Sequence, residues 1–298
     1  VVYELDDLEL AGNLAVGGEL STPSAGTSNT RVGVNTGNSI ASGGNYNVLV
    51  GDEAGTALTT GDGNVAVGFE ALKTEDANGE STAVGYQALK TQNAGASGLN
   101  TAVGYQAGLS VTTGVQNTLI GAQAGDALTS GGQNVAIGYL ALSLETTSSN
   151  NVAIGREALK TSNGGVGNVA VGRTALAALT TGDNNVGVGL SVLLANTTGA
   201  DNVAVGKNAL VANTTASFNV AIGADALESN TTGANNTAVG TGALDANTTA
   251  SNNTAVGQAS LGANTSTGDN NTAIGQLSLT TNTTGRFNVA SGVDALRR

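Results

Sequence analysis

The chain has 298 residues and a net charge of −12, with 45 glycines, one proline and no cysteine, histidine, methionine or tryptophan. Charged residues are only 11% of the sequence and apolar residues 40%, which argues against a disordered chain. Affinity for phosphates is built from Lys and Arg, so the acidic balance argues against a nucleic-acid partner. No apolar run is long enough to insert into a membrane as a helix.

Residues 1–12 are interpreted as a lead-in that continues an upstream fibre region, because they precede the first copy of a repeated phrase. From residue 13 onward the phrase N-x-A-V/I-G recurs with variations, and its glycine runs from Gly17 to Gly292. Every step between Gly104 and Gly257 is 17 residues, and the other steps are 16 to 19. A short, nearly fixed period indicates a stacked repeat architecture, so residues 13–298 are assigned to one repeat domain.

Residues 13–130 hold the irregular copies. When the Asn of the phrase is counted as position one, position nine is Leu in 12 copies. Three early copies have glycine there, and each has an apolar residue three places later. We expect a second type of coil in this stretch, with the apolar side chain moved along the turn. The three glycines are Gly55, Gly108 and Gly125.

Residues 131–298 hold the regular copies. Val, Ile or Thr at positions two and four favours a short strand, and the glycine at position five permits a sharp corner. The NTTG segments at 196–199, 230–233 and 282–285 are typical of turns. Seventeen residues cannot hold two helices and their connections. The predicted fold class is all-β: a parallel β-solenoid of about 17 coils, each a strand, a corner, a second strand and a turn.

Stacking explains why the phrase recurs. Equivalent residues in successive coils of a solenoid lie about 4.8 Å apart, so an amide side chain can bond to its copies above and below. Position one is Asn in every copy except the one that begins at Ser81, which predicts a structural amide ladder. Its members include Asn64, Asn134, Asn151, Asn202, Asn219, Asn236, Asn253 and Asn271.

Two apolar columns are expected, one from positions two and four and one from the Ala-Leu pair at positions eight and nine. A coil of 17 residues is thin, and one column largely fills it. A Leu column left in water would exceed the apolar patch that monomers usually expose, and a three-fold homo-oligomer about the long axis would cover it. We therefore expect a homotrimer, with a flattened monomeric roll that encloses both columns as the alternative.

The phrase N-[TV]-A-[VI]-G resembles the head repeats of trimeric autotransporter adhesins, the YadA-like head. The longer phrases NTAVGYQA at 100–107 and STAVGYQAL at 81–89 also resemble repeats of phage tail fibres. The resemblance covers nearly the whole chain and implies a left-handed parallel β-roll in a homotrimer. The repeat is longer here than in the adhesin heads.

Catalytic chemistry is not expected. Without His and Cys the chain lacks the commonest general base, the commonest metal ligand and the thiolate nucleophile. Glu70 and Glu157 share position seven, where one acid per coil is expected to form a solvated edge. We therefore expect neither enzyme activity nor a cofactor.

The GDGN and GDNN turns resemble calcium-binding β-roll turns. Their aspartates, Asp62, Asp183 and Asp269, are scattered among copies that carry other residues at that position. We expect each Asp to cap its own turn backbone rather than to bind calcium. The N-x-S/T sequons arise from the same turn and strand phrases and are interpreted as turn chemistry.

Three tyrosines, Tyr86, Tyr105 and Tyr139, directly follow a corner glycine and form a possible interaction surface, with packing across subunits as the alternative. The chain as a whole is predicted to be the structural shaft or head of an extracellular trimeric fibre, at a cell surface or on a virion. It would mediate attachment through a tip, outside this segment, that binds a receptor or glycan. The alternatives are a structural filament or matrix protein and an ice-binding solenoid. The ice-binding alternative needs a regular Thr array, which the mixed Thr and Val of position two interrupt.

Overall fold

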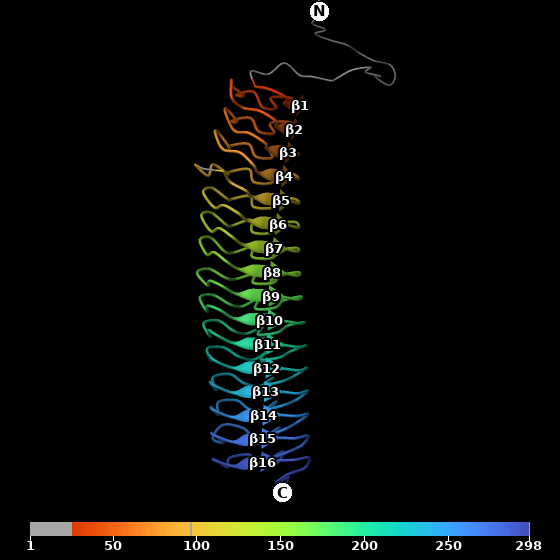
Figure 1. Ribbon diagram of the computed structural model, residues 1–298, viewed down its shortest axis with the longest axis vertical. Coiled ribbons are helices and arrows are strands. Elements are labelled where there is room, and N and C mark those ends of the chain that lie inside the picture. The colour runs from red at the N-terminus through yellow and green to blue at the C-terminus, as the bar shows by residue number, and fades with distance from the viewer. Residues whose placement is uncertain (1–25, 96, 298) are drawn as a thin grey trace, which may run out of the picture.

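The computed structural model describes residues 26–95 and 97–297, which form one long stack of coils (Figure 1). Each coil contributes one strand of three residues, and the 16 strands pair in chain order in a single parallel sheet. They span about fifteen full turns. The strands are β1 (Thr30–Val32), β2 (Val48–Val50), β3 (Val65–Val67), β4 (Thr82–Val84), β5 (Thr101–Val103), β6 (Thr118–Ile120), β7 (Val135–Ile137), β8 (Val152–Ile154), β9 (Val169–Val171), β10 (Val186–Val188), β11 (Val203–Val205), β12 (Val220–Ile222), β13 (Thr237–Val239), β14 (Thr254–Val256), β15 (Thr272–Ile274) and β16 (Val289–Ser291).

This arrangement confirms the predicted all-β parallel solenoid with a 17-residue repeat. No helix occurs among residues 26–95 and 97–297, and so none of that part of the chain is a helical membrane span. The predicted coil around Gly17 and the lead-in at 1–12 lie outside the described residues.

Equivalent positions stack in register along the rod. Val205, Ile222 and Val239 are consecutive partners in β11, β12 and β13. The register also survives a longer step, since Thr254 of β14 pairs with Thr272 of β15, 18 residues further on. The extra residue is therefore accommodated in the turns, as predicted. At about 4.8 Å per step the sheet is roughly 70 Å long.

Each strand ends at a glycine because the coils approach too closely there for a side chain. Gly206, directly after β11, has a φ of +131°. A Cβ at this residue would lie 2.5 Å from the carbonyl oxygen of Gly223 in the next coil. Glycine alone avoids this overlap and adopts the required φ without strain.

The predicted second strand of each coil is absent. In the coil of β12, Asp225 and Leu227 have φ values of 57° and 52°, and Asn235, before β13, has a φ of 57°. Residues in the left-handed region cannot continue an extended strand, so the chain bends repeatedly between one strand and the next. A leucine in this region costs about 1–3 kcal/mol, and its burial offsets this strain.

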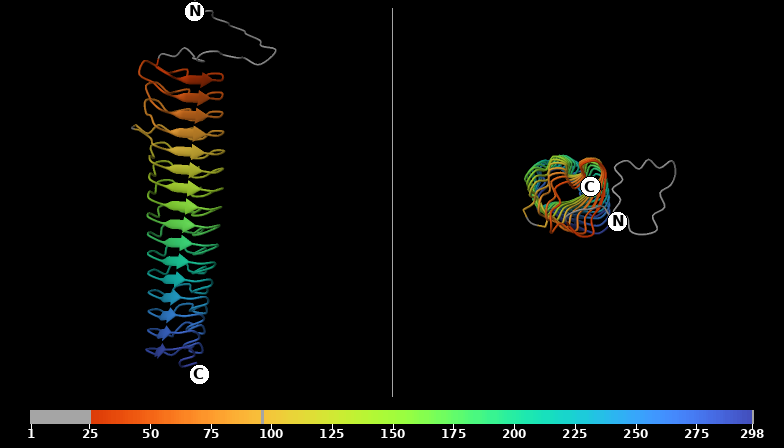
Figure 2. Two further views of the ribbon diagram at one scale, coloured as in Figure 1. Left: turned by 45° about the vertical axis from the view of Figure 1, so that its right-hand side comes forward. Right: turned by 90° about the horizontal axis from the view of Figure 1, so that it is seen from above.

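The interior is filled by positions three, eight and nine. Ala221, Ala226 and Leu227 are all fully buried in one coil, and the narrow cross-section recurs along the stack (Figure 2). The Leu column is therefore buried within a single chain, and the premise that a partner must cover it is wrong. The alternation of the strand explains the outcome: position three points inwards, so positions two and four point outwards.

Irregular coils keep the interior filled by exchanging side-chain volume between positions. In the coil of β2, Leu49 replaces the inward Ala and Gly55 replaces the Leu of position nine. A Cβ on Gly55 would lie 2.9 Å from the Leu49 side chain. Leu58, three residues after Gly55, is fully buried. The predicted second type of coil is therefore a local exchange of volume within a close-packed interior.

Candidate functional site

The outward side of the sheet is the largest uniform surface of the rod. We call it the strand face and define it as the first and last residues of all sixteen strands. Every one of these residues except Ser291 is Val, Ile or Thr. At its centre Val205 and Ile222 are 37% and 41% exposed. The face is roughly 70 Å long and about 7 Å wide, longer than the apolar patches on most monomers.

Behind the strand face, the asparagines of position one form an internal ladder. The backbone N–H of Asn219 donates to Oδ1 of Asn202 at 3.0 Å, and that of Asn236 donates to Oδ1 of Asn219 at 2.9 Å. Nδ2 of Asn219 donates across the coil to the carbonyl oxygen of Gly233 at 3.0 Å. The other predicted members whose backbone donates to the preceding Asn are Asn64, Asn134, Asn151, Asn202, Asn253 and Asn271.

A second amide ladder lies at position twelve, and sequence reasoning missed it. Nδ2 of Asn213 donates to Oδ1 of Asn196 at 3.1 Å and to the carbonyl oxygen of Ala216 at 3.0 Å. These asparagines open the NTT sequons that were interpreted as turn chemistry, and their burial hides them in the folded coil. The available signal was that NTT recurs at the same step as the first ladder. The members are Asn196, Asn213, Asn230, Asn247 and Asn264, all fully buried.

The residues directly after the corner glycines form a second surface, which we call the corner column. The rings of Phe69 and Tyr86 stack with centroids 5.3 Å apart, and those of Tyr86 and Tyr105 with centroids 5.4 Å apart. The structure thus brings two of the three predicted tyrosines together and adds Phe69. Tyr139 follows after one intervening coil, which carries Ala122. Phe69 in GFEAL occupies the place of Tyr86 in GYQAL, so the sequence did contain this signal.

Glu70 lies in an ion network rather than on a solvated edge. Its carboxylate accepts hydrogen bonds from Nζ of Lys73 at 2.6 Å and from Nε2 of Gln87 at 2.7 Å, and Nζ of Lys90 lies 2.7 Å away. The bond from Lys73, followed by that from Lys90, lowers the pKa of Glu70 to about 2. Glu157 pairs with a different cation several coils along the rod, so the two acids of position seven do not form a site.

The turn aspartates cap the neighbouring coil. Oδ1 of Asp183 accepts a hydrogen bond from the backbone N–H of Val166 in the preceding coil at 2.7 Å. Asp62 and Asp269 make the equivalent bond at 2.6 and 2.9 Å. The prediction that each Asp caps its own turn is therefore wrong. Among the described residues no group of three or more acidic side chains is arranged to hold a metal ion.

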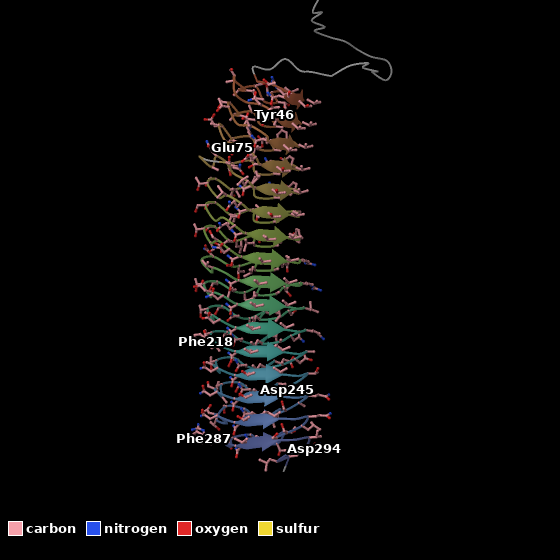
Figure 3. All side chains as sticks on the ribbon, viewed as in Figure 1. Tyr46, Glu75, Phe218, Asp245, Phe287 and Asp294 are labelled. Atoms are coloured by element: carbon pink, nitrogen blue, oxygen red, sulfur yellow. The ribbon has the colours of Figure 1, made fainter. Side chains whose placement is uncertain are left out.

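Isolated aromatic residues occur at the turn that precedes position one. Phe218 and Phe287 are 59% and 77% exposed and project from the rod (Figure 3). Phe218 has a φ of 62°, in a place where the neighbouring coils carry Asp201 and Asn235. Phe218 therefore stands alone and forms no patch with the coils above and below.

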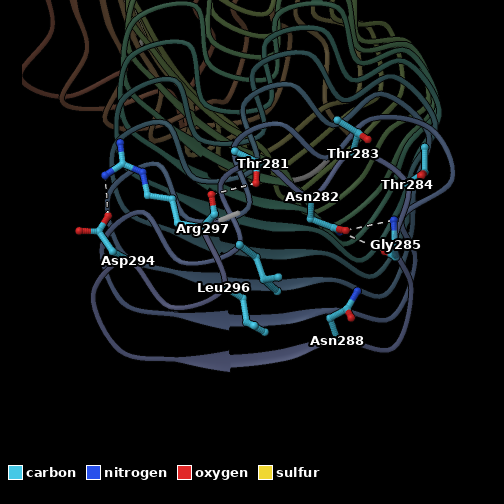
Figure 4. A pocket seen from close by; sticks show the side chains of 10 residues that line it. Thr281, Asn282, Thr283, Thr284, Gly285, Asn288, Asp294, Leu296 and Arg297 are labelled. Carbon is cyan, nitrogen blue, oxygen red and sulfur yellow. Dashed lines mark hydrogen bonds and ion pairs between the residues drawn. The ribbon is translucent and has the colours of Figure 1, made fainter.

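A hollow of about 740 Å³ lies at the end of the stack beyond β16 (Figure 4). Its lining includes Leu279, Asn282 and Leu296, which occupy interior positions of the last coils. Nη1 of Arg297 donates to Oδ1 of Asp294 at 2.9 Å at its rim. The hollow is therefore the open cross-section of the solenoid rather than a ligand cavity.

The exposed features of the rod thus reduce to the strand face and the corner column, because ladders and apolar columns occupy its interior. No protein-family model, no curated protein and no solved structure matches the chain.

Proposed function

We propose that this chain is the rigid shaft or head of an extracellular fibre that assembles from three parallel copies and mediates attachment to a cell surface. The observation that carries the proposal is the strand face. Apolar surface is covered with a gain of roughly 25 cal/mol per Å², and this face runs the whole length of the rod without a charged side chain. A second and a third copy of the same rod match its length and register.

The two columns of the strand face favour a ring over a two-fold pair. The first residues of the strands mix Val with Thr, whereas the last residues are Val or Ile in every strand but β16. The columns therefore differ, and the first column of one rod can pack against the second column of the next. Such a heterologous contact closes into a ring when the rotation allows it, and three rods are the smallest ring.

A rod of this kind acts by spacing and presentation. Its coils are held by backbone pairing and two internal amide ladders, which favour rigidity over binding pockets. A receptor or glycan would be bound at a tip outside this segment or on the flanks of the rod. No catalytic role is part of the proposal.

The assembly is tested by measuring the mass of the purified chain in solution by light scattering. The expected value is three times 28.8 kDa, about 86 kDa. The triple variant Val205→Asp, Ile222→Asp, Val239→Asp places three charges on the strand face and is expected to run as a monomer with an unchanged circular dichroism spectrum. Thr215→Asp, on an exposed turn, is the control and should keep the mass. A monodisperse monomer from the unaltered chain would overturn the proposal.

Attachment is tested by binding of the fluorescently labelled chain to cells, measured by flow cytometry. Three linked copies raise the apparent affinity of a weak site by avidity, so the triple variant should bind far less than the control variant. Equal binding by the two variants would separate attachment from assembly and would contradict the proposed link.

The strand face also favours a second candidate function, binding to ice. The columns that mix Thr with Val stand on the exposed side of a flat sheet with a repeat of about 4.8 Å, which is the geometry that the Thr-array alternative needs. This function requires the face to be free, so the chain would be monomeric and show thermal hysteresis. The triple variant would abolish the hysteresis, whereas a trimer without hysteresis would remove this candidate.

A further inference from the structure

We propose that the flank of the rod binds a single pyranose ring in a gap of the corner column, between the rings of Tyr105 and Tyr139 and above Ala122. The inference goes beyond the fibre proposal because it locates a ligand site on the rod itself and requires no tip. It also holds for either oligomeric state.

The backbone keeps the corner column evenly spaced across the gap. The N–H of Gln123 donates to the carbonyl oxygen of Tyr105 at 2.8 Å, one coil below. The next two coils make the equivalent bonds to Ala122 and Tyr139 at 3.2 and 2.9 Å. Ala122 therefore occupies a full step of the column with only a methyl group, and the rings on either side are two steps apart.

The width of the gap suits one ring. Adjacent rings of the column stand 5.3 and 5.4 Å apart, so the centroids of Tyr105 and Tyr139 are expected about 11 Å apart. A ring midway between them would lie about 5.4 Å from each, within the roughly 4.5–7 Å range of stacked rings. Tyr139 has no ring partner among the described residues, and Tyr105 is stacked on one face only. Both are about half exposed.

The polar group beside the gap favours a sugar over an aromatic side chain. Nε2 of Gln106 donates to Oε1 of Gln87 at 3.0 Å, which extends the side-chain bonds of position seven up to the gap. Gln123 stands in the coil of Ala122, and its side-chain amide makes no hydrogen bond within the described residues. A pyranose has C–H faces for the two tyrosines and edge hydroxyls for this donor and acceptor, whereas an aromatic side chain uses only the faces.

The site is tested by NMR on the full chain with three probes: the methyl glycosides of glucose, galactose and N-acetylglucosamine. At least one probe is expected to show saturation transfer and upfield shifts of its ring protons, because both of its faces lie against aromatic rings. Ala122→Tyr fills the gap with the residue that Tyr86 and Tyr105 already carry at this position, so the coil should fold. We expect it to weaken binding on the order of ten-fold or more.

Ala224→Tyr is the matched control. Ala224 holds the same position in the coil of β12, but its neighbours in the column are Lys207 and Thr241, so no pair of rings is filled there. Binding should be unchanged in this variant. The proposal is overturned if none of the three glycosides binds, if Ala122→Tyr binds as well as the unaltered chain, or if p-cresol, a planar aromatic probe, binds the gap more tightly than every glycoside. The solution mass of both variants shows separately whether assembly is intact.

Discussion

At the residue scale, the rod depends on positions where the stacked backbone accepts a single side-chain type. The corner glycines meet the carbonyl of the next coil, and the position-one asparagines satisfy buried backbone groups of two coils at once. Each requirement recurs at every step, so one substitution is expected to disturb two neighbouring interfaces.

Gly206→Ala should destabilise the rod by about 3 kcal/mol or more, because its Cβ would lie 2.5 Å from the carbonyl oxygen of Gly223. Gly63→Ala is the control, since Gly63 also has a positive φ, of 67°, but a Cβ there meets open space. The control should cost about 1 kcal/mol. Urea unfolding followed by circular dichroism measures both, and equal losses would contradict the close-approach explanation.

Asn219→Ala should cost about 2–4 kcal/mol. The change leaves the N–H of Asn236 and the carbonyl oxygen of Gly233 buried without a partner. Asn235→Ala removes the same amide at an exposed turn and should cost about 1 kcal/mol or less, through its positive φ alone. The comparison is made on melting temperatures, and a cost for Asn219→Ala no larger than for Asn235→Ala would show that the ladder contributes little.

Glu70 gives the rod a specific sensitivity to acid. Its pKa is lowered from the usual value of 4.5 to about 2 in the folded chain, so its charged form is stabilised by folding. This contribution is present above pH 4.5 and is lost as the pH falls towards 2. Glu70→Gln should remove it, so the melting temperatures of the two proteins should converge between pH 4.5 and 2. With Glu157→Gln, whose partner cation is largely exposed, a smaller pH-dependent difference is expected. Parallel melting curves for Glu70→Gln would refute the role of the network.

At the element scale, one coil is a closed unit whose interior volume must be constant. Leu49 with Gly55 fills the same space as Ala221 with Leu227, from the opposite side of the coil. The coils of the rod are therefore alternative solutions to one packing problem, joined by a sheet that does not change.

Exchanging the two solutions should be tolerated only when both residues change. Leu49→Ala leaves a cavity and should cost about 2–5 kcal/mol, and Gly55→Leu alone overlaps the Leu49 side chain. The double variant recreates the regular coil and should recover at least half of the summed loss, because Leu adopts the same positive φ at position nine elsewhere. Strictly additive losses in urea unfolding would contradict the exchange.

The sequence allowed the period, the register and the position of the strand to be predicted, because each depends on local residue types repeated at a fixed step. The inward face of the strand was harder to predict. Val205 is larger than Ala204, which suggested that valine fills the interior. The structure buries Ala204 because Leu210 enters from the other side of a thin coil and leaves room for a methyl group. Burial of Asn196 was missed for a related reason, since NTTG is typical of solvated turns.

At the scale of the whole molecule, the uniform strand face and the uneven corner column indicate different tasks. The face repeats in all sixteen strands, as contact with an equally long partner requires. The corner column changes from Phe69 and Tyr86 to Arg156 and Lys207 along the rod, so any ligand it binds is expected at particular coils. Assembly and recognition would then be separable by substitution.

The parallel pairing of the strands has a mechanical consequence. The bonds between coils lie along the axis of the stack, so a pull on the two ends loads the outermost coil first. A detached 17-residue coil extends to roughly 55 Å of chain in place of about 4.8 Å of rod. Under tension the rod should therefore lengthen stepwise, each step lowering the load on its anchorage, and should shorten again by re-pairing coils when the force is released.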